Sequence, residues 1–284
     1  MQFIKVLFKV LFVLRRKNKI LVGVTTFYKQ YLKVSVSGLA QLNKDFVLVI
    51  HNDNPNTKVT KREIRKIGYR GELHIINTAY NKGLLKSRLT IIDWVKSKRK
   101  NPDWIVFVDD DDMLLNLDIP SVSENNFAII QNMAVVRTRM VDVLRLMDNS
   151  RDYEIDNENV YLVRPHIGMA GTLVRGDVIM GFAEKVNSIL SDISDIDESL
   201  SYRPPVDMMM WSGLNIFARH LNDAATPIYM DTVNYIATDI DTAPEKYGMK
   251  IQPAKNPATQ ISHAIARYDA ALRAVLDAAP AGQE

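Results

Sequence analysis

The 284-residue sequence contains no cysteine. This absence excludes disulfide bonds, a thiolate nucleophile and cysteine-ligated zinc, and it suits a reducing compartment such as the cytoplasm. Histidine is also scarce, and four of the five histidines fall in no spacing typical of metal ligands, namely His51, His74, His220 and His263. The sequence therefore excludes thiol chemistry and offers no histidine-based metal motif.

Residues 1–19 have no hydrophobic run long enough to span a bilayer, and their cations follow the apolar stretch, unlike those of a secretory signal. This segment has no acidic residue, and its cations are Lys5, Lys9, Arg15, Arg16, Lys17 and Lys19. On a helix, Lys5, Lys9 and Arg16 would share one side and apolar residues would cover the rest, as in helices that lie in an anionic membrane interface. Packing on the protein's own domain is the alternative. We expect a cytoplasmic protein, with peripheral membrane contact as one role for residues 1–19.

The rest of the chain lacks a strong charge of either sign. Removing the six N-terminal cations leaves 30 basic against 33 acidic residues, a net charge of −3. A slightly acidic body does not favour nucleic acid as a partner. The content of 47% apolar and 24% charged residues is typical of an ordinary globular protein.

Strand and helix patterns alternate from residue 20 onward. We expect strands at 19–27, 45–53, 71–78 and 103–112, with helices at 31–42 and 84–98. This order is typical of βαβ units, so we predict an α/β fold with a mostly parallel sheet flanked by helices. Polar residues follow three of these strands, and such strand ends should converge on one crevice.

The second half of the sequence is less regular. We expect a helix to start after Pro204-Pro205, because proline is tolerated in the first helical turn. A C-terminal helix should begin after Asn256, with an apolar stripe that includes Tyr268 and Leu272. The predicted organisation is an N-terminal segment at 1–19, a first half of the domain at 20–116, a second half at 117–245 and a helical tail at 246–284.

Four consecutive aspartates, Asp109 to Asp112, follow the strand "WIVFV". One or two could cap a turn, but adjacent like charges cost free energy unless a cation or hydrogen bonds offset them. Mg²⁺ and Mn²⁺ bind carboxylate oxygens together with phosphate oxygens. The run therefore predicts a metal-bridged phosphate ligand.

Four segments, in this order and spacing, resemble the nucleotide-binding half of inverting GT-A glycosyltransferases, in particular family 2. They are "KILVGVTTFYKQ", "FVLVIHNDNPNT", "NTAYNKGLLKSRL" and "WIVFVDDDDML", and the similarity covers roughly residues 20 to 115. The resemblance implies a GT-A, Rossmann-like fold and transfer of a sugar, with inversion, from a nucleotide-sugar donor. It makes residues 20–116 the nucleotide-sugar-binding half and residues 117–245 the acceptor-binding and catalytic half. It further implies Mn²⁺ or Mg²⁺ as cofactor, a UDP-sugar as the expected donor, and a glycan, lipid-linked or other hydroxyl acceptor.

The resemblance also assigns the donor-side residues. Thr25, where the family has proline, would lie near the nucleotide base, and Asp53 would contact the base. Gly83 and Arg88 match the third motif, with the guanidinium near the base and diphosphate. The aspartate run forms the DXD motif, in which Asp109 reaches the ribose or the metal, Asp110 adjoins the cofactor and Asp111 is the chief metal ligand. The sequence departs from the family pattern at Thr25, Asn52 and Leu89, which leaves the identity of the base open.

Members of the family carry a carboxylate base at the start of a later helix, and Asp207 in "YRPPVDMMMWSGL" is the best match. An aspartate at this place is also a good N-cap. Trp211 could line the acceptor site or simply pack on an apolar helix face. In "HIGMAGTLVRGD", the resemblance places the sugar pocket at His166 and Gly171, although a lone histidine is often structural.

Two other classes of function remain open from the sequence. A strand followed by Asp-x-Asp also resembles haloacid-dehalogenase-type phosphohydrolases, which would use Asp109 as nucleophile. That class requires Thr or Val at the position of Met113 and a further acid after "RGDVIM", and neither is present. A catalytically degenerate protein that binds nucleotide or glycan is the other alternative, because Val206 stands where a second acid is common.

Overall fold

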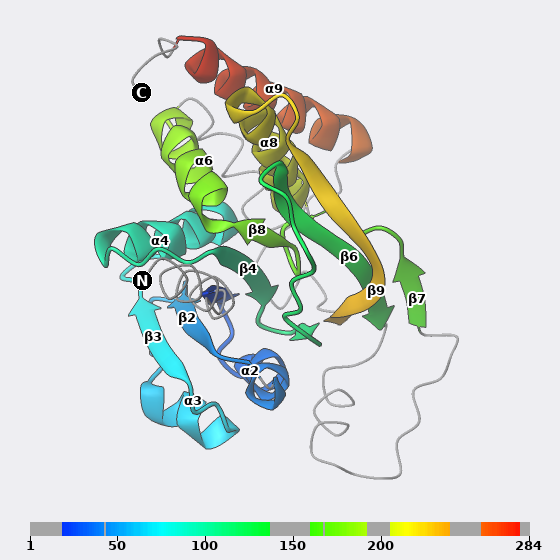
Figure 1. Ribbon diagram of the computed structural model, residues 1–284. Coiled ribbons are helices and arrows are strands. Elements are labelled where there is room, and N and C mark those ends of the chain that lie inside the picture. The colour runs from blue at the N-terminus through cyan, green and yellow to red at the C-terminus, as the bar shows by residue number, and fades with distance from the viewer. Residues whose placement is uncertain are drawn as a thin grey trace, which may run out of the picture.

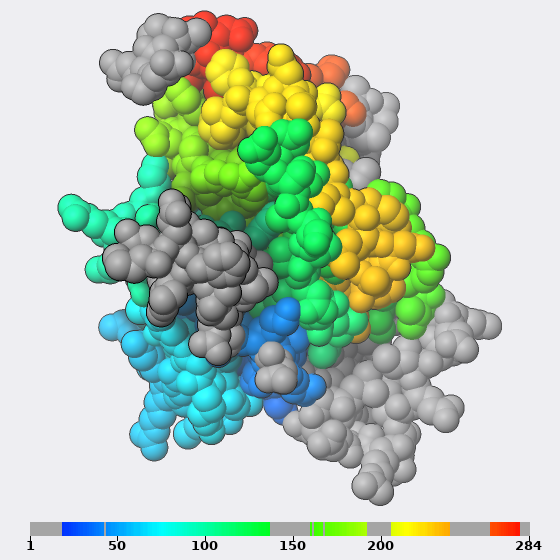
Figure 2. All heavy atoms as spheres, in the orientation of Figure 1, coloured from blue at the N-terminus to red at the C-terminus, as the bar shows by residue number. Residues whose placement is uncertain are grey.

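The computed structural model describes residues 19–42, 44–136, 160–166, 168–191, 205–238 and 257–278. One sheet passes through the protein, with helices on both faces (Figure 1). The elements of the first half and of the second half pack into one continuous body, and α8 and α9 lie together at the end opposite α3 (Figure 2). The predicted α/β class is therefore confirmed.

The first half of the sheet is parallel, with strand order β3-β2-β1-β4. Its strands are β1 (Ile20–Thr26), β2 (Phe46–Asn52), β3 (Glu72–Asn77) and β4 (Trp104–Asp109). Helices α2 (Leu32–Gln41) and α4 (Gly83–Ser97) connect them. Each of these elements matches a predicted one, because strongly periodic apolar segments decide both the type and the place of an element.

The short helix α3 (Lys61–Ile67) was not predicted. It begins with a capping box, in which Thr60 accepts a hydrogen bond from the Glu63 amide and the Glu63 carboxylate bonds the Thr60 amide. The sequence "TKRE" carries this signal, because Ser or Thr followed three residues later by Glu marks a helix start.

The second half of the sheet is mixed and continues the order β4-β8-β6-β9-β5, while β7 pairs with β6. The strands are β5 (Met113–Leu114), β6 (Asn126–Val136), β7 (Val160–Val163), β8 (Leu173–Arg175) and β9 (Thr226–Thr238). β8 is antiparallel to β4 and β6, whereas β6 and β9 are parallel. As a result, the end of β9 lies beside the short strand β5, directly after the aspartate run.

Two apolar layers cover the sheet. One layer holds α4, α6 (Gly176–Ile189), α8 (Pro205–Leu221) and α9 (Pro257–Ala278), and the other holds α2 and α3. Within α9, the side chains of Tyr268 and Leu272 are completely buried, which confirms the predicted apolar stripe. Helix α8 starts at Pro205, as its proline pair predicted.

Several predictions fall outside the described residues, among them the N-terminal segment up to residue 18, the Asn256 cap and the acidic stretch at 192–200. Within the described ranges, no helix has both the length and the apolar content needed to cross a membrane.

Candidate active site

The carboxyl ends of β1, β2 and β4 bring polar residues together, as parallel strands require. Thr25 is in register with His51 of β2 on one side and with Asp109 of β4 on the other. The side chain of Thr25 is buried. This edge of the sheet is where open α/β sheets bind ligands.

Three of the four consecutive aspartates are held by other parts of the protein. Thr26 Oγ1 donates a hydrogen bond of 2.5 Å to Asp110. Asp112 accepts one of 2.7 Å from the Tyr235 hydroxyl and one of 2.8 Å from the Thr238 amide, both on β9. Asp109 accepts one of 3.0 Å from Arg88 Nη2. These bonds offset part of the repulsion within the run.

Asp111 differs from its three neighbours, because no side chain of the described residues binds its carboxylate. Burial, reinforced by repulsion from Asp109, raises the pKa of Asp111 to about 7. Burial also raises the pKa of Asp109, Asp110 and Asp112, and a neighbouring carboxylate adds to each shift. A cation at Asp111 would relieve a cost that the protein itself leaves uncompensated.

Arg88 lies behind the aspartate run and joins it to α8. Its side chain is 0% exposed, with Nη2 on Asp109, Nη1 on Asp207 and the guanidinium 5.6 Å from the ring centre of Phe107. Burial opposes its charge, but Asp207 and Asp109 outweigh that effect and raise the pKa of Arg88. The side chain is fully buried between two carboxylates, so contact between Arg88 and a diphosphate stays a prediction.

Asp207 lies in the first turn of α8 and faces the aspartate run. One of its oxygens accepts a hydrogen bond from Arg88, and the other accepts one of 3.3 Å from the Ala170 amide. Both bonds come from outside α8, so they differ from the bonds of an N-cap. The side chain is 20% exposed, which leaves part of the carboxylate open to a ligand.

His166 and two glycines pack around Asp207. The His166 ring stacks on Tyr235 with 6.2 Å between ring centres, and its Nε2 lies 2.9 Å from the Ala170 carbonyl. Burial lowers the pKa of His166, and the nearby Asp207 opposes this shift. A Cβ atom added at Gly168 would lie 3.0 Å from His166 and 3.3 Å from Asp207. The backbone therefore passes close to both side chains.

Gly171 has a structural requirement for glycine. Its φ is +73°, and an added Cβ would lie 2.6 Å from the Tyr235 ring. The predicted sugar-pocket residues His166 and Gly171 are thus brought together with Asp207, and both contact Tyr235.

Asp53 closes the amino end of α4. Its two oxygens accept hydrogen bonds of 2.8 Å from the amides of Lys82 and Gly83, and Gly83 has a φ of +78°. Burial raises the pKa of Asp53, while these two amides act in the opposite direction. Each oxygen keeps a second lone pair, so contact between Asp53 and a nucleotide base stays a prediction.

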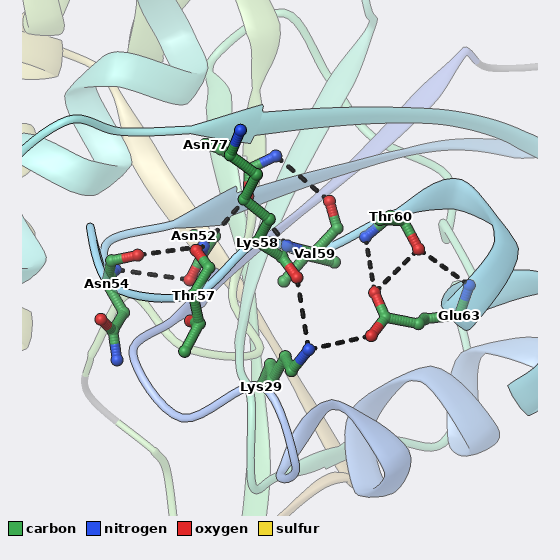
Figure 3. A network of polar contacts seen from close by, with 9 residues as sticks. All are labelled: Lys29, Asn52, Asn54, Thr57, Lys58, Val59, Thr60, Glu63 and Asn77. Carbon is green, nitrogen blue, oxygen red and sulfur yellow. Dashed lines mark hydrogen bonds and ion pairs between the residues drawn. The ribbon is translucent and has the colours of Figure 1, made fainter.

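Two asparagines shape the loop between β2 and α3 (Figure 3). The Asn52 amide donates hydrogen bonds to the Thr57 carbonyl at 2.7 Å and to Asn77 Oδ1 at 3.0 Å, and Asn77 is bonded to both backbone groups of Val59. An aspartate at position 52 could not donate these bonds. The departure from the family pattern at Asn52 therefore has a structural cause.

Comparison with known proteins bears on the alternative functions that the sequence left open. Residues 22–124 match the model of the family described as Glycosyl transferase family 2. The matched stretch, which covers less than half of the chain, resembles a family 2 glycosyltransferase domain. The matched residues include most of β1, all of β2 to β4, Asp53, Arg88 and all four aspartates. The predicted resemblance to family 2 and the predicted GT-A class are therefore confirmed. The haloacid-dehalogenase-type alternative is not supported.

Three solved structures are similar to this chain, each with a TM-score below 0.5. TarS 1-349 of S. aureus shares 15% identity, with 92% of this chain and 82% of that chain covered and a TM-score of 0.47. The apo-form glycosyltransferase GlyE of Streptococcus pneumoniae TIGR4 shares 10%, with 92% and 64% covered and a TM-score of 0.37. GalNAc-T7 with UDP, GalNAc and Mn2+ shares 13%, with 43% and 24% covered and a TM-score of 0.33. No curated protein matches the sequence.

Trp211 does not lie in the candidate active site. Its side chain is 8% exposed and stacks on Phe127, 6.0 Å between ring centres, inside the apolar layer of α6, α8 and α9. Packing accounts for this residue, and we leave it out of the acceptor site.

Tyr235 and Thr238 were not predicted as site residues. They lie at the end of β9, more than 120 positions after the aspartates that they bind. Nothing in the local sequence "VNYIAT" marks this role, because it depends on the pairing of β9 with β5. Thr26 carried a signal, since it directly follows β1 at the edge where ligands were expected.

Among the described residues, the candidate active site offers two carboxylate ligands for a divalent ion, Asp109 and Asp111. Within the described ranges, no three His, Asp or Glu side chains converge on one point. Mg²⁺ is commonly bound by one or two carboxylates plus substrate phosphates, and Asp109 with the unpaired Asp111 fits that pattern.

Proposed function

We propose that the protein is a metal-dependent, inverting glycosyltransferase that moves a sugar from a nucleotide-sugar donor to an acceptor hydroxyl. One observation carries the proposal: Asp207, whose side chain is 20% exposed, bonds the same buried arginine as Asp109 of the DXD motif. A carboxylate that can accept a proton is thus fixed beside carboxylates that can bind a metal and a diphosphate.

Asp207 acts as the general base. The acceptor hydroxyl donates its proton to Asp207 as the acceptor oxygen attacks the anomeric carbon from the side opposite the diphosphate. The bond between the anomeric carbon and the diphosphate oxygen breaks, the electron pair leaves with the nucleoside diphosphate, and the configuration is inverted. The Ala170 amide and Arg88 orient the carboxylate for this step.

Asp109 and Asp111 would hold the divalent ion, either Mn²⁺ or Mg²⁺. When bound, the ion stabilises negative charge on the diphosphate. Asp111 is free to bind it because no other described side chain occupies its carboxylate. Asp112 and Asp110 fix the backbone of the run through β9 and Thr26.

Thr25, Asp53, Gly83 and Asp110 line the donor side. Asp53 and Gly83 support the proposal because they meet at the amino end of α4, whose dipole favours an anionic ligand. We propose a UDP-sugar as donor, in line with the family resemblance.

The acceptor reaches Asp207 past His166 and Gly171. We propose a glycan, lipid-linked or other hydroxyl acceptor, and do not favour nucleic acid because residues 20–284 carry a net charge of −3. The cations of residues 1–19 would hold the protein at an anionic membrane surface from the cytoplasmic side.

Titration calorimetry against a panel of nucleotide sugars, with and without Mn²⁺, tests the proposal. We expect one sugar nucleotide to bind only with the metal, and NMR of the product to show the anomeric configuration opposite to that of the donor. Retention of configuration would exclude the role of Asp207 as base. Tight binding without turnover on any acceptor hydroxyl, including water, would favour the degenerate alternative.

A further inference from the structure

Arg88 is the one fully buried arginine side chain of the described residues, and it contacts carboxylates of two different elements. Nη2 lies 3.0 Å from Asp109 at the end of β4, and Nη1 bonds Asp207 in the first turn of α8. The third nitrogen, Nε, is buried without a hydrogen-bond partner in the described structure. Because the side chain is 0% exposed, the guanidinium presents no accessible edge to a further ligand.

We infer that Arg88 is a positioning residue that sets the distance between the donor-side carboxylate Asp109 and the base Asp207, without contacting the nucleotide. This inference rests on the proposed function. It gives Arg88 a different role from the one that the family resemblance implies, which is contact with the nucleotide base and the diphosphate.

The geometry explains why an arginine is required. Two carboxylates that face each other repel, and a guanidinium fork neutralises both while its planar N–H groups fix their directions. The ammonium group of a lysine is a compact charge that cannot bond two carboxylates through one planar group. The guanidinium carbon of Arg88 lies 5.6 Å from the centre of the Phe107 ring, which packs against it.

The link matters for the reaction because the two carboxylates serve opposite partners. Asp109 belongs to the donor half, whereas Asp207 receives the acceptor proton. Misplacement of a reacting group by about 1 Å can cost about 10²-fold in rate. Asp111, the proposed chief metal ligand, makes no contact with Arg88, so Arg88 acts on the rate of transfer more than on donor affinity.

The variant Arg88→Lys tests this role in the full chain, with nucleoside diphosphate and Mn²⁺ as the binding probe. We expect kcat for transfer to fall by about 10²-fold, while the Kd for nucleoside diphosphate and the KM for donor stay within about threefold of wild type. Arg65→Lys is the matched control, because Arg65 also uses both terminal nitrogens, on the carbonyls of Tyr69 and Gly71, away from the site. It should leave kcat unchanged.

A second comparison separates positioning from a general loss of structure. In the Asp207→Asn background, Arg88→Lys should cause little further loss of kcat, because the two residues act as a unit. If Arg88→Lys is too unstable to assay, the double variant Arg88→Gln with Asp207→Asn can replace it in the measurement of nucleoside diphosphate binding. In this double variant the new amide at position 88 faces a single carboxylate, that of Asp109.

Three results would overturn the inference: loss of nucleoside diphosphate binding in a variant that stays folded, an unchanged kcat, or losses that add in the double variant. Failure of the proposed function is distinct from these results. It would appear in the wild-type protein, which would then neither bind a nucleotide sugar nor transfer its sugar.

Discussion

The hydroxyl of Tyr235 donates a hydrogen bond of 2.7 Å to Asp112. The same oxygen accepts a hydrogen bond of 3.1 Å from the Asp109 amide, so one side chain of β9 contacts both ends of the aspartate run. Stacking on His166 and close contact with Gly171 hold the ring in place. The carboxylates of the DXD motif thus depend on a strand from the other half of the chain.

Replacing the hydroxyl should loosen this connection. Tyr235→Phe leaves the buried Asp112 with the Thr238 amide as its remaining partner, and we expect a loss of about 1 to 3 kcal/mol in the free energy of unfolding. Urea denaturation measures it. Tyr229→Phe is the matched control, because Tyr229 is 46% exposed and bonds Asn132 near the surface. Equal losses in the two variants would contradict a special role for Tyr235.

The aspartates of the run should differ in their response to the same change. Asp111→Asn should abolish Mn²⁺-dependent binding of nucleoside diphosphate with little change in stability, because only an unpaired carboxylate is lost. Asp110→Asn should retain more binding, since an amide oxygen still accepts the bond from Thr26. Calorimetry with Mn²⁺ and after its removal by EDTA distinguishes them. Normal metal dependence in Asp111→Asn would show that the ligand lies elsewhere.

Asp207→Asn should remove the general base but keep the shape of the side chain. We expect kcat to fall by about 10² to 10⁴-fold while donor affinity stays close to wild type. Asp177→Asn is a matched control, because Asp177 also lies in the first turn of a helix and pairs with an arginine, Arg175. Near-normal turnover in Asp207→Asn would direct attention to Asp197 or Glu198, which lie outside the described residues.

The N-terminal segment can be tested by deletion. Removing residues 1–19 should release the protein from vesicles that contain anionic lipid at low salt, and should preserve hydrolysis of the sugar nucleotide. Co-sedimentation at two salt concentrations measures this. An unfolded or insoluble truncation would instead show that the segment packs on the domain, and binding that ignores salt would exclude the electrostatic contribution.

The sequence predicted the parallel half of the fold well, because its signals are local. The apolar runs of β1, β2 and β4 and the polar residues after them lie next to one another in the chain, and parallel pairing brings their ends together. The order of the family motifs added Asp53, Arg88 and Asp207 as candidates.

The remainder depended on contacts between distant parts of the chain. The Tyr235–Asp112 bond requires the register of β9 against β5, and the burial of Arg88 requires α8 to pack on α4. No periodicity encodes either relationship. For the same reason, the sequence could not decide whether Trp211 faces the acceptor or the core.

His51 should make the stability of the protein sensitive to mild acid. Its side chain is 0% exposed, neither ring nitrogen has a hydrogen-bond partner in the described structure, and burial, with Lys82 adding repulsion, lowers its pKa to about 4. The unfolded chain takes up this proton near pH 6.5 and the folded chain does not. The contribution of the neutral His51 to the free energy of unfolding is therefore fully present above pH 6.5. It falls as the pH drops towards 4 and changes no further below that pH.

The variant His51→Leu should remove this sensitivity. Between pH 7 and pH 5, the free energy of unfolding of the wild type should fall by about 2 kcal/mol more than that of the variant, as measured by urea denaturation at each pH. The raised pKa values of the buried aspartates also contribute to the pH dependence, but they are common to both proteins and cancel in the comparison. His220→Gln is the control, because His220 lies exposed at the end of α8. If His51→Leu lost as much stability as the wild type over this range, the buried ring would not be the group that titrates.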